Sequence, residues 1–235
     1  MIYGFRAVLE ALSSRRREVF EVLDATGSKE VARAAAERSV RVGKLDRRRA
    51  DELTRGGVHQ GVLARVEEYP YVGLDDLLGV DTPLLLVLDG VTDPHNLGAV
   101  LRVAEGAGVT GVVIPKDRSA SVNAVVVKAS SGASEHLPVA RETNLRRALD
   151  RMKEVGVWVF AAESGAGTNH TKLDMAGPVA LVLGSEGKGV RRLVREGCDG
   201  AVEIPMSGAV GSLNVSVAAA VLAFEARRQR GWNLT

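Results

Sequence analysis

A glycine-rich loop carrying a single acid is the first stretch of the sequence that could bind a ligand. The apolar run LVLG continues into SEGKGV, so residues 181–190 hold three glycines around Glu186. Glycine has no Cβ and lets backbone N–H and C=O groups approach a flat or bulky ligand closely. The carboxylate could hold a partner arginine or pair with a ligand group. A tight turn with a surface acid is the alternative, and we favour ligand binding.

The second candidate loop is DGVTDPHNLGAVLRVAEGAG, residues 89–108, which contains Asn96 and Arg102. Pro94 fixes the backbone just before a predicted helix, and Asn96 could cap that helix. The two residues lie six positions apart, so they do not share a helical face. They can still meet if Asn96 lies in the loop. A cap and a solvated arginine are the simpler interpretations, but the apolar residues around Arg102 favour a function for it.

The third loop is IPMSGAVGSLNVSVAAA, residues 204–220, in which small residues surround Ser212 and Asn214. Either side chain could cap the helix that follows, or contribute polar atoms to a site. All three loops follow predicted strands, and ligands of open α/β sheets bind at the carboxyl ends of the strands. The sequence therefore predicts that the three loops contribute to one site.

Other common motifs do not explain the sequence. Residues 106–111 spell a dinucleotide-binding fingerprint, but they close a helix, whereas that fingerprint must open one. The loop at 184–190 lacks the spacing of a phosphate-binding loop. The four histidines are scattered without metal-ligand spacing, so no metal site is expected.

The elements that position these loops alternate between apolar strands and amphipathic helices. From residue 83 onward this alternation is typical of α/β proteins with an open, mostly parallel sheet. Strands are expected within 84–90, 110–115, 157–163, 177–187 and 200–206, helices within 96–108, 144–156, 189–197 and 212–230, and a helix followed by a strand within 123–139.

The first part of the chain is predicted to be a separate module. Residues 1–66 read as a compact α/β domain, the acidic stretch 67–82 as a linker, and residues 83–235 as the second domain. The first module holds 14 Lys and Arg against 9 Asp and Glu, a net charge of +5, with clusters at Arg15–Arg17 and Arg47–Arg49. Such clusters fit a polyanion partner, and a solvated surface is an equally good interpretation.

Composition narrows the class of protein. Apolar residues make up 46% of the chain and charged residues 26%, which are values typical of globular proteins and argue against disorder. A single cysteine excludes an internal disulfide and favours a reducing compartment. No stretch approaches the roughly 20 apolar residues of a membrane span. We expect a soluble cytoplasmic protein that does not bind membranes.

Together, the three loops resemble the signature motifs of the SpoU/TrmH family of RNA 2′-O-ribose methyltransferases. DPHNLGAVLR resembles the first motif, LVLGSEGKGV the second and IPMSGAVGSLNVSVAAA the third. The stretches YGFRAVLEAL and HQGVLA resemble the N-terminal substrate-binding domain of members that methylate a guanosine of bacterial 23S rRNA. Members that act on tRNA or confer antibiotic resistance share the catalytic domain, so those targets stay open.

The resemblance implies a fold and a cofactor. The fold would be a SPOUT domain, a mostly parallel α/β sheet with a C-terminal trefoil knot, preceded by a small L30e-like α/β substrate-binding domain. S-adenosylmethionine would bind near the ends of the strands, ribosomal RNA would be the substrate, and the protein would act as a homodimer without a metal. The implied cofactor-binding residues are Gly184, Gly187, Ile204, Met206 and Leu213.

The resemblance also assigns the catalytic residues, which are Asn96, Arg102, Glu186, Ser212 and Asn214. In the family the arginine is the proposed general base. A guanidinium has a pKa above about 12, and a bidentate clamp on a phosphate of the target suits it better. Two other classes stay open, a nucleotide-dependent enzyme and an RNA-binding protein without activity, although the presence of all five polar residues argues against the latter.

Overall fold

The chain forms two compact units in the computed structural model, which describes residues 1–185 and 187–232. The first unit comprises Met1–Pro70 together with Ser121–His136. The second comprises Tyr71–Ala120 and the chain from Leu137 onward. These units do not follow the boundaries expected at residues 66 and 83, because a segment from the second half of the sequence packs within the first unit.

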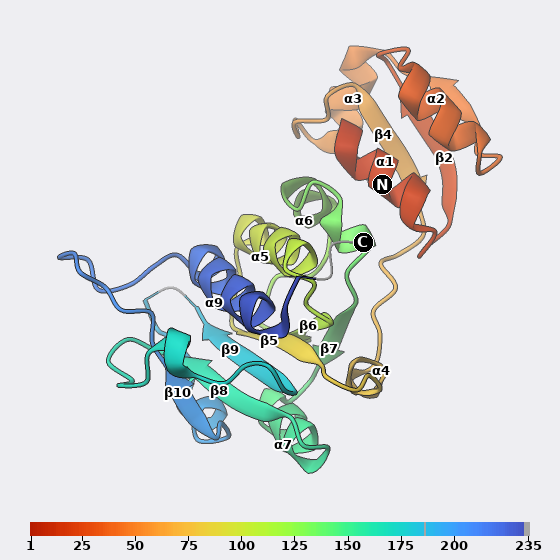
Figure 1. The fold of residues 1–235 in the computed structure, drawn as a ribbon. Helices are drawn as coiled ribbons and strands as arrows, with labels where there is room; N and C mark the ends of the chain where they lie inside the picture. The colour runs from red at the N-terminus through yellow and green to blue at the C-terminus, as the bar shows by residue number, and fades with distance from the viewer. Residues whose placement is uncertain (186, 233–235) are drawn as a thin grey trace. The chain divides into compact units, whose positions relative to one another are not determined.

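The first unit contains a four-stranded mixed sheet with the strand order β1-β4-β2-β3 (Figure 1). β4 pairs antiparallel with β1 and β2, while β3 pairs parallel with β2 at the edge. Its elements are β1 (Ile2–Tyr3), α1 (Phe5–Ser14), β2 (Val19–Asp24), α2 (Lys29–Ala36), β3 (Val42–Lys44), α3 (Arg47–Thr54), β4 (Val62–Val66), α6 (Ala124–Ala129) and the short 3-10 helix η1 (Ala133–Glu135).

The local sequence explains most elements of this unit. The apolar residues of α1 recur at helical spacing and are buried. Ser28 caps α2, because its side chain accepts a hydrogen bond from the backbone N–H of Val31. The sequence did not predict α3, since Ala50 is its one buried residue and no apolar stripe marks it.

The segment 121–136 is held in the first unit by buried polar contacts. The Arg17 guanidinium donates from Nε to Glu135 Oε2 at 2.9 Å and from Nη2 to Oε1, and both side chains are almost completely buried. The Tyr69 hydroxyl donates to the Ser134 carbonyl at 3.0 Å. The predicted second domain is therefore interrupted by a segment that completes the first unit.

The second unit contains a six-stranded sheet with the order β10-β8-β9-β5-β6-β7, in which every neighbouring pair is parallel. This confirms the α/β class. Its elements are α4 (Leu74–Leu78), β5 (Leu84–Asp89), α5 (Pro94–Gly106), β6 (Gly111–Pro115), β7 (Val139–Glu142), α7 (Leu145–Glu154), β8 (Trp158–Ala162), the 3-10 helix η2 (His170–Lys172), β9 (Val179–Gly184), α8 (Arg192–Arg195), β10 (Gly200–Val202) and α9 (Val215–Arg230). α4 lies inside the stretch expected to be a linker.

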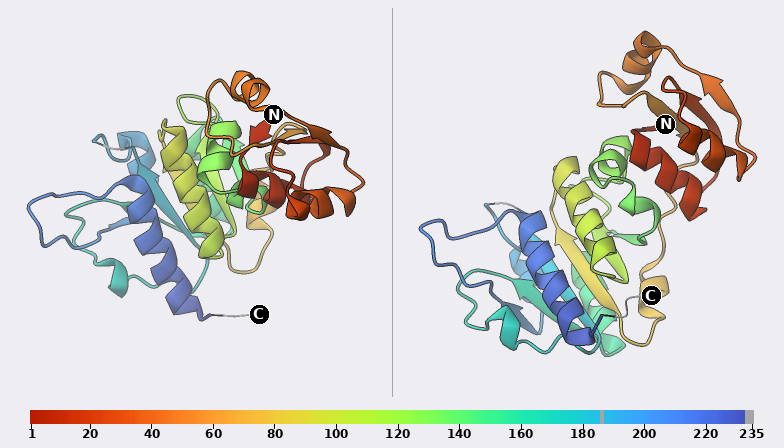
Figure 2. Two further views of the ribbon diagram at one scale, coloured as in Figure 1. Left: turned by 90° about the horizontal axis from the view of Figure 1, so that it is seen from above. Right: turned by 45° about the horizontal axis from the view of Figure 1, so that its top comes forward.

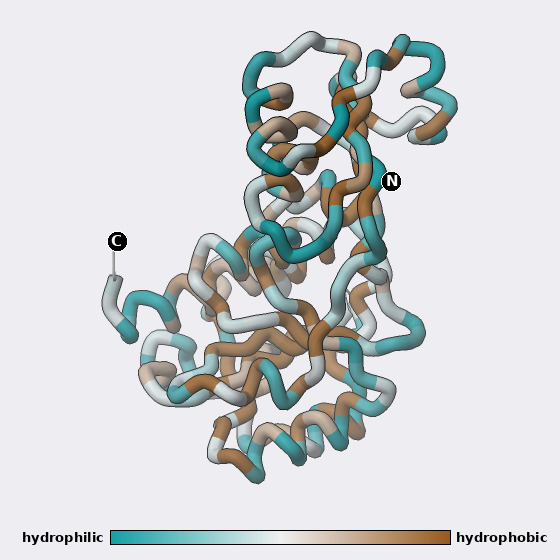
Figure 3. Tube along the Cα trace, turned by 90° about the vertical axis from the view of Figure 1, so that its right-hand side faces the viewer, coloured by the Kyte–Doolittle hydropathy of each residue, from teal (hydrophilic) through white to brown (hydrophobic). Residues whose placement is uncertain are grey.

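Helices cover both faces of this sheet. α5 and α9 lie side by side on one face (Figures 1 and 2). α4 and α7 pack on the other, where Leu85 and Val87 of β5 belong to their apolar cluster. Alternate residues of a strand point to opposite faces, so a strand covered on both sides is apolar throughout. Every residue of β5 is buried, and hydrophobic residues gather along the strands in Figure 3.

Two expectations concern the chain as a whole. None of the helices in the described part is long and apolar enough to cross a membrane. The trefoil knot implied by the family resemblance stays a prediction, because strand pairing does not report how the chain is threaded.

Candidate functional site

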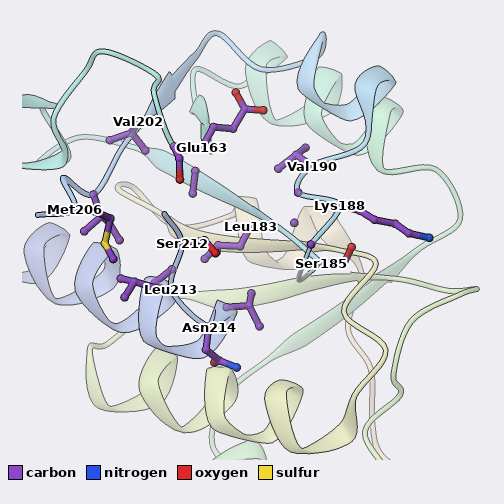
Figure 4. A pocket seen from close by; sticks show the side chains of 18 residues that line it. Glu163, Leu183, Ser185, Lys188, Val190, Val202, Met206, Ser212, Leu213 and Asn214 are labelled. Carbon is purple, nitrogen blue, oxygen red and sulfur yellow. The ribbon is translucent and has the colours of Figure 1, made fainter. Parts of the chain in front are cut away.

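A cavity of about 750 Å³ lies in the second unit, at the carboxyl ends of β8, β9 and β10 and the start of α9 (Figure 4). Two of the three candidate loops line it, and residues 162–164 at the end of β8 form a further wall that the sequence did not predict. Its lining includes Gly184, Gly187, Ile204, Met206, Ser212, Leu213 and Asn214. The carboxyl ends of neighbouring parallel strands thus create the hollow, as expected for this sheet type.

The glycine-rich loop folds tightly against the end of its own strand. Gly189 N–H donates to the Ser185 carbonyl at 2.9 Å, and a Cβ at Gly184 would lie 2.0 Å from the Gly189 carbonyl carbon. Gly187 has a φ of 76°, which disfavours other residues. The glycines were expected to keep side chains away from a ligand, but the loop backbone itself already requires glycine at 184 and 187. Glu186 lies outside the described residues.

A buried acid that the sequence analysis missed holds the far end of this loop. Asp89 ends β5 beside Gly184, and its side chain is completely buried. Its Oδ2 accepts from the Arg191 backbone N–H at 2.7 Å, and its Oδ1 accepts from Arg191 Nε at 2.7 Å. Such charge-assisted bonds are among the stronger contacts in proteins. An acid ending an otherwise apolar strand was the signal for this anchor.

Asn96 and Asn214 meet although 118 residues separate them. Asn214 Nδ2 donates to Asn96 Oδ1 at 3.0 Å. Asn214 also caps α9, because its Oδ1 accepts from the Ser216 N–H at 2.9 Å. Asn96 does not cap α5, contrary to the expectation. Asp93 does so by accepting from His95 N–H at 2.9 Å, and Pro94 is already the first residue of the helix.

Arg102 is exposed on α5, whereas the sequence suggested that it lies within an apolar face. The buried residues of α5 are Leu97, Gly98, Val100, Leu101 and Ala104. Residue 102 falls outside this stripe because of the helical period. Neither Arg102 nor Asn96 contributes to the described lining of the cavity. The arginine therefore lies on a helix that is joined to the cavity through the Asn96–Asn214 bond.

The loop before α9 forms the remaining wall of the cavity (Figure 4). Ile204 and Leu213 are half-buried, while Met206 and Ser212 are exposed. The Ser164 hydroxyl donates to the Gly211 carbonyl at 2.9 Å, which joins this loop to the wall after β8. The cavity is thus lined by main-chain groups, apolar side chains and a few hydroxyl and amide groups, a composition suited to an organic ligand.

Glu163, which lines the cavity, is a further acid that the sequence analysis missed. Arg195 of α8 donates from Nε to Glu163 Oε2 at 2.7 Å. Cys198 lies in the same neighbourhood, and burial raises the pKa of its thiol to about 11. Because the thiolate is the nucleophilic form, this thiol is not a candidate nucleophile at neutral pH.

The comparisons with known proteins cover both units. The model of the SpoU rRNA methylase family matches residues 83–224, and a model described as RNA 2′-O ribose methyltransferase substrate binding matches residues 1–72. The chain is 47% identical over 241 residues to a 23S rRNA (guanosine-2′-O-)-methyltransferase from Yersinia pestis, with 98% of each chain covered. It is 45% identical to the protein of that description from Escherichia coli K12, again covering 98% of each chain.

The fold agrees with a solved structure of the same kind. The SpoU methyltransferase AviRb from Streptomyces viridochromogenes, in complex with the cofactor AdoMet, superimposes with a TM-score of 0.83 at 26% identity. The match covers 97% of this chain and 89% of that one. Since the family model matches more than half of the sequence and the relatives align over nearly all of it, the chain belongs to the SpoU rRNA methylase family.

Proposed function

We propose that the protein transfers a methyl group from S-adenosylmethionine to a ribose 2′-hydroxyl of a guanosine in 23S rRNA. The observation that carries this proposal is the meeting of two motif loops around one cavity, in a chain whose first unit also matches the substrate-binding model. The relatives from Yersinia pestis and Escherichia coli carry that activity in their names and align from end to end. This alignment favours 23S rRNA over tRNA as the substrate.

The cavity fits the cofactor by size and chemistry. Its volume of about 750 Å³ lies within the range of small-molecule sites. The closely packed glycine loop presents bare main chain, and main-chain N–H and C=O groups can pair with the edge of an adenine. We propose that Gly184, Gly187, Ile204, Met206 and Leu213 hold S-adenosylmethionine.

S-adenosylmethionine, when bound, supplies an electrophilic methyl carbon and a neutral thioether leaving group. Methyl transfer to the ribose oxygen would break the carbon–sulfur bond of the cofactor, and the hydroxyl proton would pass to a phosphate of the substrate or to water. The protein's part is to align the reacting atoms and exclude competing nucleophiles.

The polar residues in and near the cavity are proposed to bind the RNA substrate. We propose that Ser212 and Asn214 contact the target ribose, and that Asn96 holds Asn214 in place through the bond between them. Arg102 is proposed to grip a phosphate of the target with its guanidinium fork, which suits its chemistry better than proton abstraction. Either Glu186 or Asn96 is proposed to hold the side chain of that arginine.

The remaining assignments extend the proposal to the whole protein. The first unit, which includes residues 1–66, would bind the rRNA, and the second unit, which includes most of residues 83–235, would carry out methyl transfer, with residues 67–82 containing a connection between them. The protein would work as a homodimer in the cytoplasm, where ribosomes are assembled.

The test is methyl transfer from labelled S-adenosylmethionine to in vitro transcripts of 23S rRNA and of tRNA. We expect label on the 23S transcript, at one guanosine that resists alkaline hydrolysis at its 3′ side. The same guanosine should lack the methyl group in rRNA from a strain without the gene, and regain it on complementation. Label on tRNA alone would overturn the proposed substrate, and no label on either RNA would overturn the activity.

A second experiment tests whether Arg102 binds a phosphate of the substrate in a bidentate manner or acts as a general base. Arg102→Lys keeps the charge but loses the fork, so turnover at saturating RNA should fall by about tenfold or more. Arg147→Lys, an exposed arginine on α7 of the same unit, is the matched control and should keep wild-type turnover. Wild-type turnover of Arg102→Lys would contradict the bidentate role.

A further inference from the structure

One short stretch of the first unit concentrates exposed positive charge. Residues 41–49, RVGKLDRRR, contain five basic residues and one acid. All five basic residues are exposed. The acid, Asp46, caps α3, because its Oδ1 accepts a hydrogen bond from the Arg49 backbone N–H at 2.9 Å. We call this stretch the basic edge.

The fold leaves this stretch accessible. β3 is the last strand in the order β1-β4-β2-β3, so one of its sides has no strand partner in the sheet. α3 begins three residues after β3 and carries Arg47, Arg48 and Arg49 in its first turn. Positive side chains on an edge strand discourage pairing with another strand, which is a simpler reason for some of this charge. That reason does not extend to the three arginines of α3.

Few of these charged side chains form ion pairs with acidic side chains of the unit. Arg48 and Arg49 both face Glu52, at 3.4 Å and 3.1 Å, and one carboxylate cannot neutralise two guanidinium groups. Among the described residues no ion pair involves Arg41, Lys44 or Arg47. These three side chains therefore face solvent without an acidic partner in the described part of the chain. Arg47 also lies in the first turn of α3, where the helix dipole disfavours positive charge and favours a bound anion.

Two other basic residues of the unit make contacts that stabilise its fold. Arg17 is buried against Glu135, and Arg38 donates from Nη1 to the Ala11 carbonyl at 3.0 Å. The other exposed basic residues of residues 1–66, such as Arg15, Arg55 and Arg65, are scattered along the sequence, whereas the basic edge gathers five within nine residues. Four of its five basic residues are arginines, whose planar forks match phosphate oxygens.

We propose that the basic edge, residues 41–49, is the surface by which the first unit binds the phosphate backbone of its RNA substrate. The proposal rests on the proposed function for the identity of the RNA. Val42, which is 40% exposed beside these charges, offers an apolar contact to a ribose or base. Phosphate contacts fix register without reading sequence, so this surface supplies affinity while the second unit selects the nucleotide.

The test compares two triple variants with equal loss of charge. The first is Arg41→Ala with Lys44→Ala and Arg47→Ala, in the basic edge. The matched control is Arg6→Ala with Lys29→Ala and Arg33→Ala, three exposed cations of α1 and α2. Both are made in the full chain, and binding to the 23S transcript is measured from 50 to 300 mM KCl, together with S-adenosylhomocysteine affinity and Tm.

Each lost phosphate contact lowers the slope of log Kd against log salt by about 0.7–0.9, so the first variant should show a slope lower by about 2–3. Its Kd at about 100 mM salt should rise at least about tenfold, with cofactor-product affinity and Tm unchanged. The control should change Kd about twofold or less. A single Arg47→Lys variant, which keeps the charge, should retain most of the affinity.

The outcomes separate this surface from the proposed function. Equal loss in both triples, or loss in neither, would overturn the basic edge as the binding surface. A wild-type protein that binds the transcript through this edge but methylates no 23S guanosine would contradict the proposed function and leave the surface standing.

Discussion

The two arginine triplets of the first unit look alike in the sequence, but two arginines of the first triplet are enclosed in the fold and none of the second is. Arg17 of the first triplet is buried against a buried carboxylate, and Arg16 packs on the Tyr69 ring with its guanidinium carbon 5.9 Å from the ring centre. In the second triplet, Arg47, Arg48 and Arg49 are all exposed on α3. A run of three arginines therefore does not by itself indicate an RNA-binding surface.

The difference comes from partners that are remote in the sequence. Glu135, which pairs with Arg17, lies 118 residues away in the segment that returns to the first unit. Glu52, which pairs in the second triplet, lies within one helical turn and is itself half-exposed. The first kind of pair stabilises the fold, and the second kind leaves positive charge available to a ligand.

The largest expected effect comes from breaking the buried pair. Arg17→Ala leaves the Glu135 carboxylate buried without its partner and should lower the free energy of unfolding by about 3–5 kcal/mol. Urea unfolding followed by far-ultraviolet circular dichroism measures it. Arg47→Ala, the exposed counterpart, should change stability by about 0.5 kcal/mol or less.

A double variant shows whether charge or shape matters at this pair. Arg17→Met with Glu135→Leu removes both charges and keeps apolar volume, so it should recover most of the lost stability. If Arg17→Ala were as stable as Arg47→Ala, the contrast between the two triplets would be wrong.

The second-largest loss of stability is expected at Asp89, the buried carboxylate of the second unit. Asp89→Ala removes the carboxylate that holds Arg191 and should destabilise the protein by about 2 kcal/mol. The loop at 184–190 would lose its anchor, so S-adenosylhomocysteine affinity should fall as well, measured by calorimetry. Arg191 is half-exposed, which makes this loss smaller than that at Arg17.

A control distinguishes anchoring from general damage. Asp150→Ala removes an acid that pairs with Arg146 on the surface of α7, and it should leave both stability and affinity nearly unchanged. Unchanged affinity in Asp89→Ala would show that the loop keeps its conformation without this anchor.

The sequence predicted the parallel sheet well because its signal is local. Apolar runs such as 84–88 followed by glycine-rich loops mark strands covered on both faces, and helices between them show apolar periodicity. The helix α3 escaped detection because it buries one alanine, and segment 121–136 was assigned to the second domain because its packing partners lie in distant parts of the chain.

The loops of the candidate site could be predicted from the sequence, but the contacts that join them to other segments could not. The cavity collects Ser212, Asn214 and Gly184 from two of the loops that the sequence singled out. The bond between Asn96 and Asn214, the anchor at Asp89 and the wall at Glu163 depend on how distant segments pack. The role of each glycine also required the structure, since only the approach of Gly189 explains Gly184.

A smaller effect sharpens the comparison within the first triplet. Arg16→Ala removes a guanidinium from the face of Tyr69 and should cost about 0.5–1 kcal/mol, measured by the same urea unfolding. RNA affinity should change less than in Arg47→Ala, because Arg16 is half-buried in the unit. A greater loss of RNA affinity in Arg16→Ala than in Arg47→Ala would place the RNA on the first triplet.

The smallest effect concerns the acid that faces the second triplet. Glu52→Gln removes ion pairs with Arg48 and Arg49 at the surface of α3, which should lower stability by about 0.3–0.5 kcal/mol.

The same change frees positive charge at the basic edge, so affinity for the 23S transcript should rise about two- to threefold at low salt and converge with the wild type at high salt. Glu37→Gln, which removes a single surface pair with Arg33 on α2, is the control and should lower stability by no more than Glu52→Gln does, without improving RNA binding. Weaker RNA binding in Glu52→Gln would mean that Glu52 orients the arginines for phosphate, so the two triplets would differ in preorganisation as well as in exposure.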